Sequence, residues 1–410
     1  MTAQRARPHG TILAIQDTSS FVYTSHAKTK GLGRMSLQKG KHVPKIYSNG
    51  LIMHACLGVT TDGVPLGLLD QRLFVRTLRS ASRRRLADVT PIEQKESYRW
   101  LTSLQNTHAI TGDTRVVTVC DREADRYELF ALSDHLRSPV LVRANVDRAV
   151  NRTSRYAEHG VLHLWDFMQQ RPAVGTRTIE IPERKATAHA TARTARTAVL
   201  TIKYGAFDFN PPRNHVTHRT AHLVDLPMHA VYAAEADPPA GDAPIDWMLI
   251  TNLPVTTFQE ACEKVAWYCL RWRIEMYFNV LKSGCHVEEC RLATGDRLIR
   301  NLTVMSVVAW RLFMITLITL IARTAPDTPC TEFLSDPEWK VLFRRVHHGK
   351  PLPHTVPPVR EVVIWIARLG GFLARKHDGM PGTRTLWRGW KRLADLTDGW
   401  RIASGTMSCG

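Results

Sequence analysis

Two apolar, β-branched runs in the sequence each carry an aspartate where the apolar pattern gives way. TILAIQDTSSFVYT (11–24) turns polar around Asp17, and VVTVCDREAD (116–125) breaks abruptly at Asp121. Short apolar runs bounded by polar turn formers are typical of buried strands. The sequence therefore predicts two central strands with an aspartate at the C-terminal end of each.

Other segments surround these strands in an α/β order. Residues 50–76 predict two strands around a hairpin turn at 61–63, and residues 92–105 predict a helix. A second helix ends near Leu136, and residues 138–148 form a further predicted strand. Strands that come first alone and then alternate with helices predict an α/β fold with a mixed sheet.

The chain changes character twice after this part. Residues 151–257 are rich in Thr, Arg and His and predict a β-rich insertion with short strands at 176–183 and 197–205. Its basic stretch 183–198 is either a solvated loop or a phosphate contact. After 258 the pattern is mainly helical, and PLPHTVPPVR (351–360) predicts a linker. The expected parts are a core in two pieces, 1–150 and 258–350, the insertion 151–257, and a helical C-terminal region, 351–410.

Charge favours a polyanionic partner. Lys and Arg number 55 against 37 Asp and Glu, which gives a net charge of +18. Nucleic acid is the leading partner for such a chain, although a merely soluble basic protein or one on an anionic membrane can carry the same charge. The eight cysteines are scattered and not gathered in CxxC pairs, which is typical of reduced, cytosolic proteins.

The run 302–322 has the length of a membrane span. Arg311 lies at its centre, where a charge costs about 2.5–3.5 kcal/mol on the translocon insertion scale. We therefore predict a buried core helix and no membrane association.

One amphipathic stretch, YCLRWRIEMYFNVLK (268–282), gathers charged side chains on one side. On a continuous helix, a stripe roughly 60° wide would contain Tyr268, Arg271, Glu275 and Lys282. Apolar residues lie on the flank and back, where they can anchor the helix to a core. A solvated face with local Glu–Arg pairs would produce the same pattern.

Three carboxylates in these segments suggest a second interpretation. Asp17 and Asp121 at strand ends, together with Glu275 on the helix, can converge to hold two divalent cations. Two Mg²⁺ ions about 3.5–4 Å apart suit phosphodiester chemistry, and hard oxygen ligands suit Mg²⁺. Basic residues beside them would then bind DNA phosphates.

The same residues resemble a known family. IQDTSS (15–20), VCDREAD (119–125) and the spacing Y-x2-R-x3-E-x6-K (268–282) resemble the signatures of DDE transposases of the Tn-five type, in the IS-four family. KES (95–97), DWMLITNLPV (246–255) and WIARLGGF (365–372) extend the resemblance from about residue 11 to the C-terminus. The resemblance implies an RNase H-like core interrupted by a β-rich insertion.

The resemblance also implies roles for single residues. It implies that two Mg²⁺ ions, which Mn²⁺ can replace, are bound by the catalytic residues Asp17, Asp121 and Glu275. Contacts to DNA are implied for Tyr268, Arg271, Lys282, Arg143, Arg291 and Trp247. A base flipped out of the duplex would stack on Trp247. The plainer interpretations are a core tryptophan at 247 and surface arginines at 143 and 291.

The implied reaction is cut-and-paste transposition of an insertion sequence through a DNA hairpin. The implied partners are double-stranded DNA, at transposon ends and target, and a second copy of the chain through residues 361–400. Two packed amphipathic helices are the plainer interpretation of 361–400. The implied setting is the bacterial cytoplasm, at the nucleoid.

One part of the family pattern is not matched. In the family a helical, end-reading domain precedes the first catalytic aspartate, whereas 16 residues precede Asp17. One hypothesis is an active transposase whose full-length form or true start lies further upstream. The other is an N-terminally truncated, inhibitory or inactive transposase that dimerises with the full-length enzyme. A non-transposing nuclease with an RNase H-like fold is a third option, which leaves Trp247 and the YREK spacing without a role.

Overall fold

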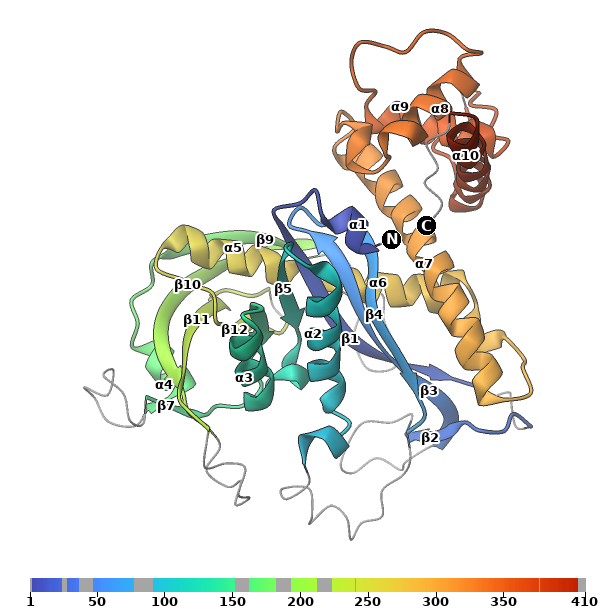
Figure 1. Ribbon diagram of the computed structural model, residues 1–410. Helices are drawn as coiled ribbons and strands as arrows, with labels where there is room; N and C mark the ends of the chain where they lie inside the picture. Colours follow the sequence, from blue (N-terminus) through green and yellow to red (C-terminus); the bar gives the residue numbers. More distant parts are fainter. Residues whose placement is uncertain are drawn as a thin grey trace. The chain divides into compact units, whose positions relative to one another are not determined.

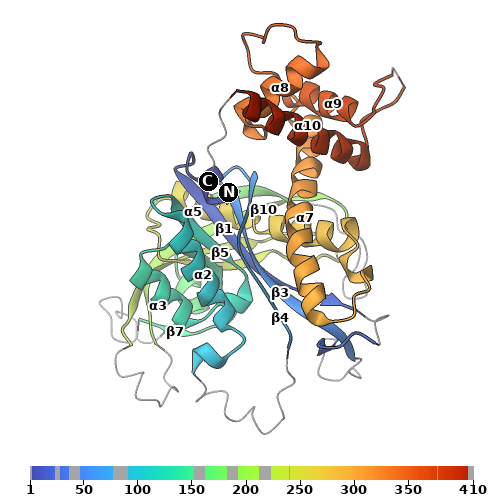
Figure 2. The same cartoon turned by 45° about the vertical axis from the view of Figure 1, so that its right-hand side comes forward.

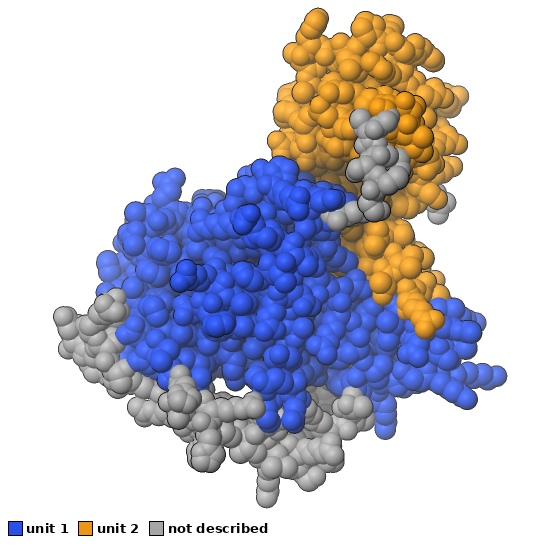
Figure 3. Space-filling view, in the orientation of Figure 1, with its two compact units in different colours: residues 1–275, 291–299 blue, residues 276–290, 300–410 orange. Residues whose placement is uncertain are grey.

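The computed structural model describes residues 2–23, 28–36, 47–76, 91–151, 162–181, 193–211, 223–239, 241–375 and 377–404. The chain forms two compact units (Figure 3). Unit 1 comprises Met1–Glu275 and Arg291–Ile299, and unit 2 comprises Met276–Cys290 and Arg300–Gly410.

Unit 1 is built on a mixed sheet of ten strands (Figure 1). The strand order is β2-β3-β1-β5-β6-β12-β11-β10-β9, and β4 also pairs with β3. The strands are β1 (Thr11–Val22), β2 (Gly33–Ser36), β3 (Tyr47–Thr60), β4 (Pro65–Phe74), β5 (Arg115–Cys120), β6 (Val140–Arg143), β9 (Gly175–Ile181), β10 (Arg196–Phe209), β11 (Leu226–Glu235) and β12 (Asp246–Thr251). β1, β5 and β6 run parallel, whereas β3 is antiparallel to both β1 and β4. The predicted α/β class with a mixed sheet is confirmed.

The β-rich stretch extends this sheet. β12 pairs antiparallel with β6, and β11, β10 and β9 follow in turn. The strands predicted at 176–183 and 197–205 are present as β9 and β10, while residues 182–192, most of the basic stretch, lie outside the described residues. A separate two-stranded sheet pairs β7 (Ala149–Val150) with β8 (Leu162–His163).

Helices α2 (Tyr98–Thr111) and α3 (Tyr127–Leu136) pack together and cover one core of unit 1 (Figure 1). The tilted rings of Phe130 and Phe209 meet within this core, with centroids 4.9 Å apart. Helix α4 (Leu164–Gln169) completes the core. The helix predicted from residue 92 begins later, because a 3₁₀ turn at Ile92–Gln94 is separated from α2 by the extended backbone of Lys95. The short helix α1 (Thr2–Ala6) packs on β4.

Unit 2 contains α8 (Asp336–Val346), α9 (Val359–Leu369) and α10 (Thr383–Ala403), which pack together beside α7 (Figures 1 and 2). Their shared core is apolar and includes Trp339, Leu342, Trp365 and Trp390. The Pro-rich run predicted as a linker is the irregular connection between α8 and α9.

Helix α7 (Gly295–Thr324) contains the long apolar run. By length and composition alone, Gly295–Arg323 would be long and apolar enough to cross a membrane, and 41% of its most apolar stretch is buried within the protein. Ile315, Ile318 and Ala322 of this helix belong to the core of unit 2. Arg311 is half-buried, with its guanidinium 5.9 Å from the ring centre of Trp310.

Candidate functional site

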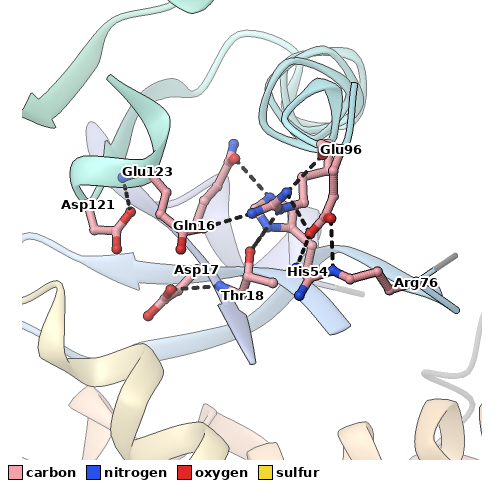
Figure 4. Close-up of polar contacts among 9 residues, drawn as sticks. Gln16, Asp17, Thr18, His54, Arg76, Glu96, Asp121 and Glu123 are labelled. Carbon is pink, nitrogen blue, oxygen red and sulfur yellow. Dashed lines mark hydrogen bonds and ion pairs between the residues drawn. The ribbon is translucent and has the colours of Figure 1, made fainter. Parts of the chain in front are cut away.

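Asp17 of β1 and Asp121, the residue that follows β5, come from neighbouring parallel strands of unit 1. The register of the two strands ends with the pair Ile15 and Val119, and each aspartate lies two residues beyond that pair. Neighbouring strands are about 4.8 Å apart, which brings the two side chains close together (Figure 4). Contrary to the sequence prediction, β1 does not end at Asp17, because its antiparallel pairing with β3 continues to Val22. Asp17 lies instead where the pairing of β1 with β5 ends.

The Asp121 side chain is held by the turn that it begins. Asp121 is the N-cap of the 3₁₀ helix η3 (Arg122–Ala124), and its Oδ1 accepts a hydrogen bond of 2.9 Å from the backbone N–H of Glu123. This bond satisfies a donor that the short helix would otherwise leave free. The bond holds one oxygen of the Asp121 carboxylate at the start of η3.

The single helix predicted over 268–282 is interrupted. The chain forms α5 (Phe258–Cys269), α6 (Trp272–Asn279) and a π-helical turn η5 (Val280–Gly284). Between α5 and α6 the backbone tightens, since Arg271 N–H donates to Tyr268 C=O at 3.0 Å and Arg273 N–H to Leu270 C=O at 2.9 Å, each three residues back. The predicted stripe is consequently not one regular helix face.

A glycine in the β3–β4 turn packs against this junction. Gly63 has φ +91°, and a Cβ there would lie 2.9 Å from Leu270 Cδ2 and 3.1 Å from an Arg273 nitrogen. A side chain at 63 would therefore push the junction away and also strain the turn. The predicted hairpin thus helps to place the segment that carries Arg271.

Arg271 bridges two of the three predicted metal ligands. Its Nη1 lies 3.2 Å from Asp17 Oδ2, and its Nη2 forms an ion pair with Glu275 Oε1. The side chains of Arg271 and Asp17 are 15% and 16% exposed. Asp17, Glu275 and Arg271 are thereby brought together, and Asp121 is close enough to Asp17 for its charge to raise the pKa of the Asp17 carboxyl.

Electrostatics at Asp17 reflect this crowding of carboxylates. Burial raises the pKa of the Asp17 carboxyl from 3.8 to about 7. Arg271 and the Thr18 N–H oppose the rise, whereas the charges of Asp121 and Glu275 add to it. A buried carboxylate with two acidic neighbours gains from additional positive charge. The site is therefore suited to a cation.

The metal-free protein is expected to lose stability as pH rises from about 4 to about 7. The folded state then holds the Asp17 proton that the unfolded chain has released, so the unfolded state binds fewer protons and stability falls with pH. In EDTA, thermal unfolding at pH 8 should show Asp17→Asn to be more stable than wild type. The difference should shrink towards pH 5. An Asp17→Asn protein that is less stable at pH 8 would contradict the assigned shift.

A pocket of about 300 Å³ lies beside this group in unit 1. Its lining includes Arg143, Trp247, Tyr268, Arg271 and Trp272. The Trp247 and Tyr268 rings meet edge to face, with centroids 5.0 Å apart. Arg143 hydrogen-bonds the Tyr268 side chain and donates from Nη2 to Asp246 C=O at 2.7 Å. Aromatic walls with cationic edges are suited to a nucleobase and its phosphates.

Two residues of this region were not predicted from the sequence. Trp272, 46% exposed at the pocket, directly follows Arg271, and its place within the YREK spacing was the available signal. Arg99 of α2 is 8% exposed, and its Nε donates to Thr18 Oγ1 at 3.0 Å while its Nη2 contacts Glu123 Oε2 at 2.8 Å. Arg99 thus links the strand of Asp17 to the turn of Asp121, on the side where Thr18 also contacts His54 (Figure 4).

Two predicted DNA contacts are not brought to this pocket within the described residues. Arg291 is exposed in the coil before α7. Lys282 lies in η5 and belongs to unit 2, so it is not placed relative to the carboxylates of unit 1. The structure therefore unites seven of the predicted residues: Asp17, Asp121, Glu275, Tyr268, Arg271, Trp247 and Arg143.

Three carboxylates of this site are candidate ligands for a divalent cation. Within the described residues, no three His, Cys, Asp or Glu side chains are already arranged around a metal position. The guanidinium of Arg271 instead lies against both Asp17 and Glu275, as a cation in contact with two candidate ligands. Three carboxylates supply the oxygen ligands that Mg²⁺ and Mn²⁺ prefer. Asp17, Asp121 and Glu275 are thus the residues that could hold such ions.

The seven cysteines of the described residues are free thiols: Cys56, Cys120, Cys262, Cys269, Cys285, Cys290 and Cys330. The net charge of +18 favours polyanionic partners.

Comparison with protein families identifies the C-terminal part of the chain. Residues 307–410 match the family model described as the transposase Tn5 dimerisation domain. The matched residues contain α8, α9 and α10 and most of α7. The match supports homodimer formation and relates this chain to the Tn5-type transposases.

Proposed function

We propose that the protein is a DNA transposase that moves an insertion sequence by cut-and-paste transposition through a hairpin intermediate. The observation that carries the proposal is the pairing of Asp17 and Glu275 with Arg271, with Asp121 near Asp17, beside a pocket with aromatic and cationic walls. The transposase dimerisation domain at residues 307–410 supports it. A fold alone would not assign the chemistry.

The carboxylates would bind the metal ions of the reaction. Two Mg²⁺ ions, or Mn²⁺ in their place, would activate the attacking hydroxyl and stabilise the leaving oxygen. Asp17 and Asp121 would hold these ions from one side of the site, and the effect of the Asp121 charge on the pKa of Asp17 supports their proximity. Glu275 comes from the opposite element, α6, and completes the ligand set.

The same ligand set would serve each step of the pathway. Water attacks a phosphodiester at the transposon end and frees a 3′ hydroxyl, which attacks the opposite strand to form a hairpin. A second water opens the hairpin, and the 3′ end then attacks target DNA. Each step breaks one P–O bond and forms another, so a single in-line geometry suffices.

The pocket residues would hold the DNA. Arg143 and Arg271 offer guanidinium groups for phosphates, and the Tyr268 hydroxyl lies between them in hydrogen-bonding range of Arg143. Trp247 offers a ring for a base that leaves the stack at the tight hairpin turn. Lys282 and Arg291 would add phosphate contacts elsewhere on the DNA. The proposed assembly is a homodimer on double-stranded DNA in the bacterial cytoplasm.

The proposal is tested with purified protein, Mg²⁺ or Mn²⁺, and labelled DNA that carries a pre-nicked transposon end. Wild type is expected to convert the nicked end into a hairpin, and Glu275→Ala is expected to lose this product. If the variant binds the DNA as wild type does but forms no hairpin, the substitution affects the chemical step and not DNA binding. A wild-type protein that binds the nicked end with metal present and forms no hairpin would refute the proposal.

Trp247→Ala is expected to slow hairpin formation by about 10- to 100-fold, since stacking of one base on an aromatic ring contributes about 1–3 kcal/mol. Nicking of the first strand should change much less, because no base needs to leave the duplex at that step. Trp247→Phe keeps a ring and should restore most of the hairpin rate. Equal losses in nicking and hairpin formation would show that Trp247 is a packing residue of β12.

A further inference from the structure

Arg271 occupies the place where a cation would be expected between two carboxylates. One nitrogen of its guanidinium contacts Asp17 and another contacts Glu275. Both acids are proposed metal ligands, and the positive guanidinium competes with an ion for their negative charge. A divalent ion that binds both acids would therefore compete with a side chain of the protein's own.

We propose that Arg271 is a stand-in cation that positions Asp17 and Glu275 in the metal-free protein, leaves them when divalent metal binds, and then binds a DNA phosphate. This inference rests on the proposed function. Its consequence is that metal and DNA bind cooperatively, with Arg271 as the residue that couples the two.

Charge balance explains why the side chain would be needed before the metal arrives. Asp17 is largely buried, and the negative charges of Asp121 and Glu275 face it. Without a cation these carboxylates repel one another. The planar guanidinium can bind two carboxylates at once, whereas a lysine ammonium acts as a single point charge. Arg271 thus holds the two ligands near each other before a metal ion is bound.

The geometry also gives the displaced guanidinium a destination. Arg271 lines the pocket that contains Arg143, Tyr268 and Trp247. Arg271 lies at the junction between α5 and α6. Rotation about its side-chain bonds would turn the guanidinium from the carboxylates towards this pocket. A phosphate in the pocket would pair with it bidentately. DNA would then stabilise the displaced arginine and leave the carboxylates free for metal.

Thermodynamic linkage makes the idea measurable from either side. If metal raises DNA affinity by a given factor, DNA must raise metal affinity by the same factor. Arg271→Gln removes the competing charge, so the variant should bind Mn²⁺ more tightly than wild type in the absence of DNA. The same variant should lose most of the coupling, because it has no guanidinium to exchange between the two partners.

The experiment measures Mn²⁺ binding to the full chain by calorimetry, without DNA, for wild type, Arg271→Gln, Arg271→Lys and Arg122→Gln. We expect Arg271→Gln to bind Mn²⁺ about tenfold more tightly, which corresponds to about 1.4 kcal/mol. Arg271→Lys should lie between it and wild type. Arg122 is an exposed neighbour of Asp121, and Arg122→Gln removes the same charge. This control should bind Mn²⁺ with an affinity within about twofold of wild type, because exposed charges are screened by salt. Such a result would show that the effect of Arg271→Gln comes from its specific contacts and not from general electrostatics.

A second measurement compares affinity for a short nicked duplex with and without Ca²⁺, with cleavage checked in the same samples. Ca²⁺ should increase the affinity of wild type clearly more than that of Arg271→Gln. Equal or weaker Mn²⁺ binding by Arg271→Gln, or coupling equal to that of wild type, would overturn the role of Arg271 and leave the proposed metal centre intact. Absence of Mn²⁺ binding by both proteins would instead refute the metal centre, and with it the proposed function.

Discussion

Asp121→Asn is expected to reduce strand cleavage and strand transfer by at least about a thousandfold. Metal ions contribute several kcal/mol to such reactions, and each 1.36 kcal/mol changes a rate tenfold. Asn is a poor ligand for Mg²⁺, yet its side-chain oxygen can still accept the Glu123 N–H bond that caps η3, since Asn is as good an N-cap as Asp. The variant should therefore fold normally. Rates are measured on the nicked DNA end, with thermal unfolding of both proteins in EDTA.

A matched control lies at the other end of the same strand. Asp113 is exposed in the turn before β5, and Asp113→Asn removes an equal charge there. Its cleavage rate should stay within about twofold of wild type, as is usual for surface substitutions away from special features. If Asp121→Asn retained a rate similar to that of Asp113→Asn, then Asp121 would not be a metal ligand and the proposed two-metal mechanism would fail.

The sequence predicted the two aspartates because each interrupts an apolar strand, and a buried acid in that position needs a reason. Their proximity depends on strand order and register, which no local pattern contains. The parallel pairing of β1 with β5 ends two residues before both aspartates and so brings them to the same edge of the two strands. The error over the end of β1 has the same origin, since its continuation to Val22 depends on pairing with the distant strand β3.

The helical part of the site was harder to predict. Periodicity over 268–282 indicated one helix, but the chain tightens at 270–273, where Gly63 of a distant hairpin packs against it. Tertiary contact overrode the regular pattern there. Arg99 had no sequence signal at all, because its role comes from contacts to Thr18 and Glu123, both far from it along the chain.

Two glycines place the backbones of α9 and α10 in direct contact in unit 2. A Cβ added to Gly370, just after α9, would lie 1.9 Å from Thr385 C=O, and one added to Gly389 of α10 would lie 1.7 Å from Ile366 C=O. Real side chains never approach carbonyl oxygens so closely. Neither helix can yield without separating from the other, since both obstacles are backbone atoms. This crossing lies within the match to the dimerisation domain.

Gly389→Ala is therefore expected to destabilise unit 2 by about 3 kcal/mol, the upper part of the range for overpacked cores, and to weaken the homodimer. Gly399 lies in the same helix with open space around it, so Gly399→Ala should instead gain about 0.5–1 kcal/mol from better helix propensity. Calorimetry would measure unfolding, and sedimentation would measure the mass of the assembly. Both substitutions change helix propensity by the same amount, so a difference between their effects would come from the crossing of α9 and α10. If Gly389→Ala were as stable and as dimeric as Gly399→Ala, α9 and α10 could not cross at these glycines, and the C-terminal helices would have to pack in another way.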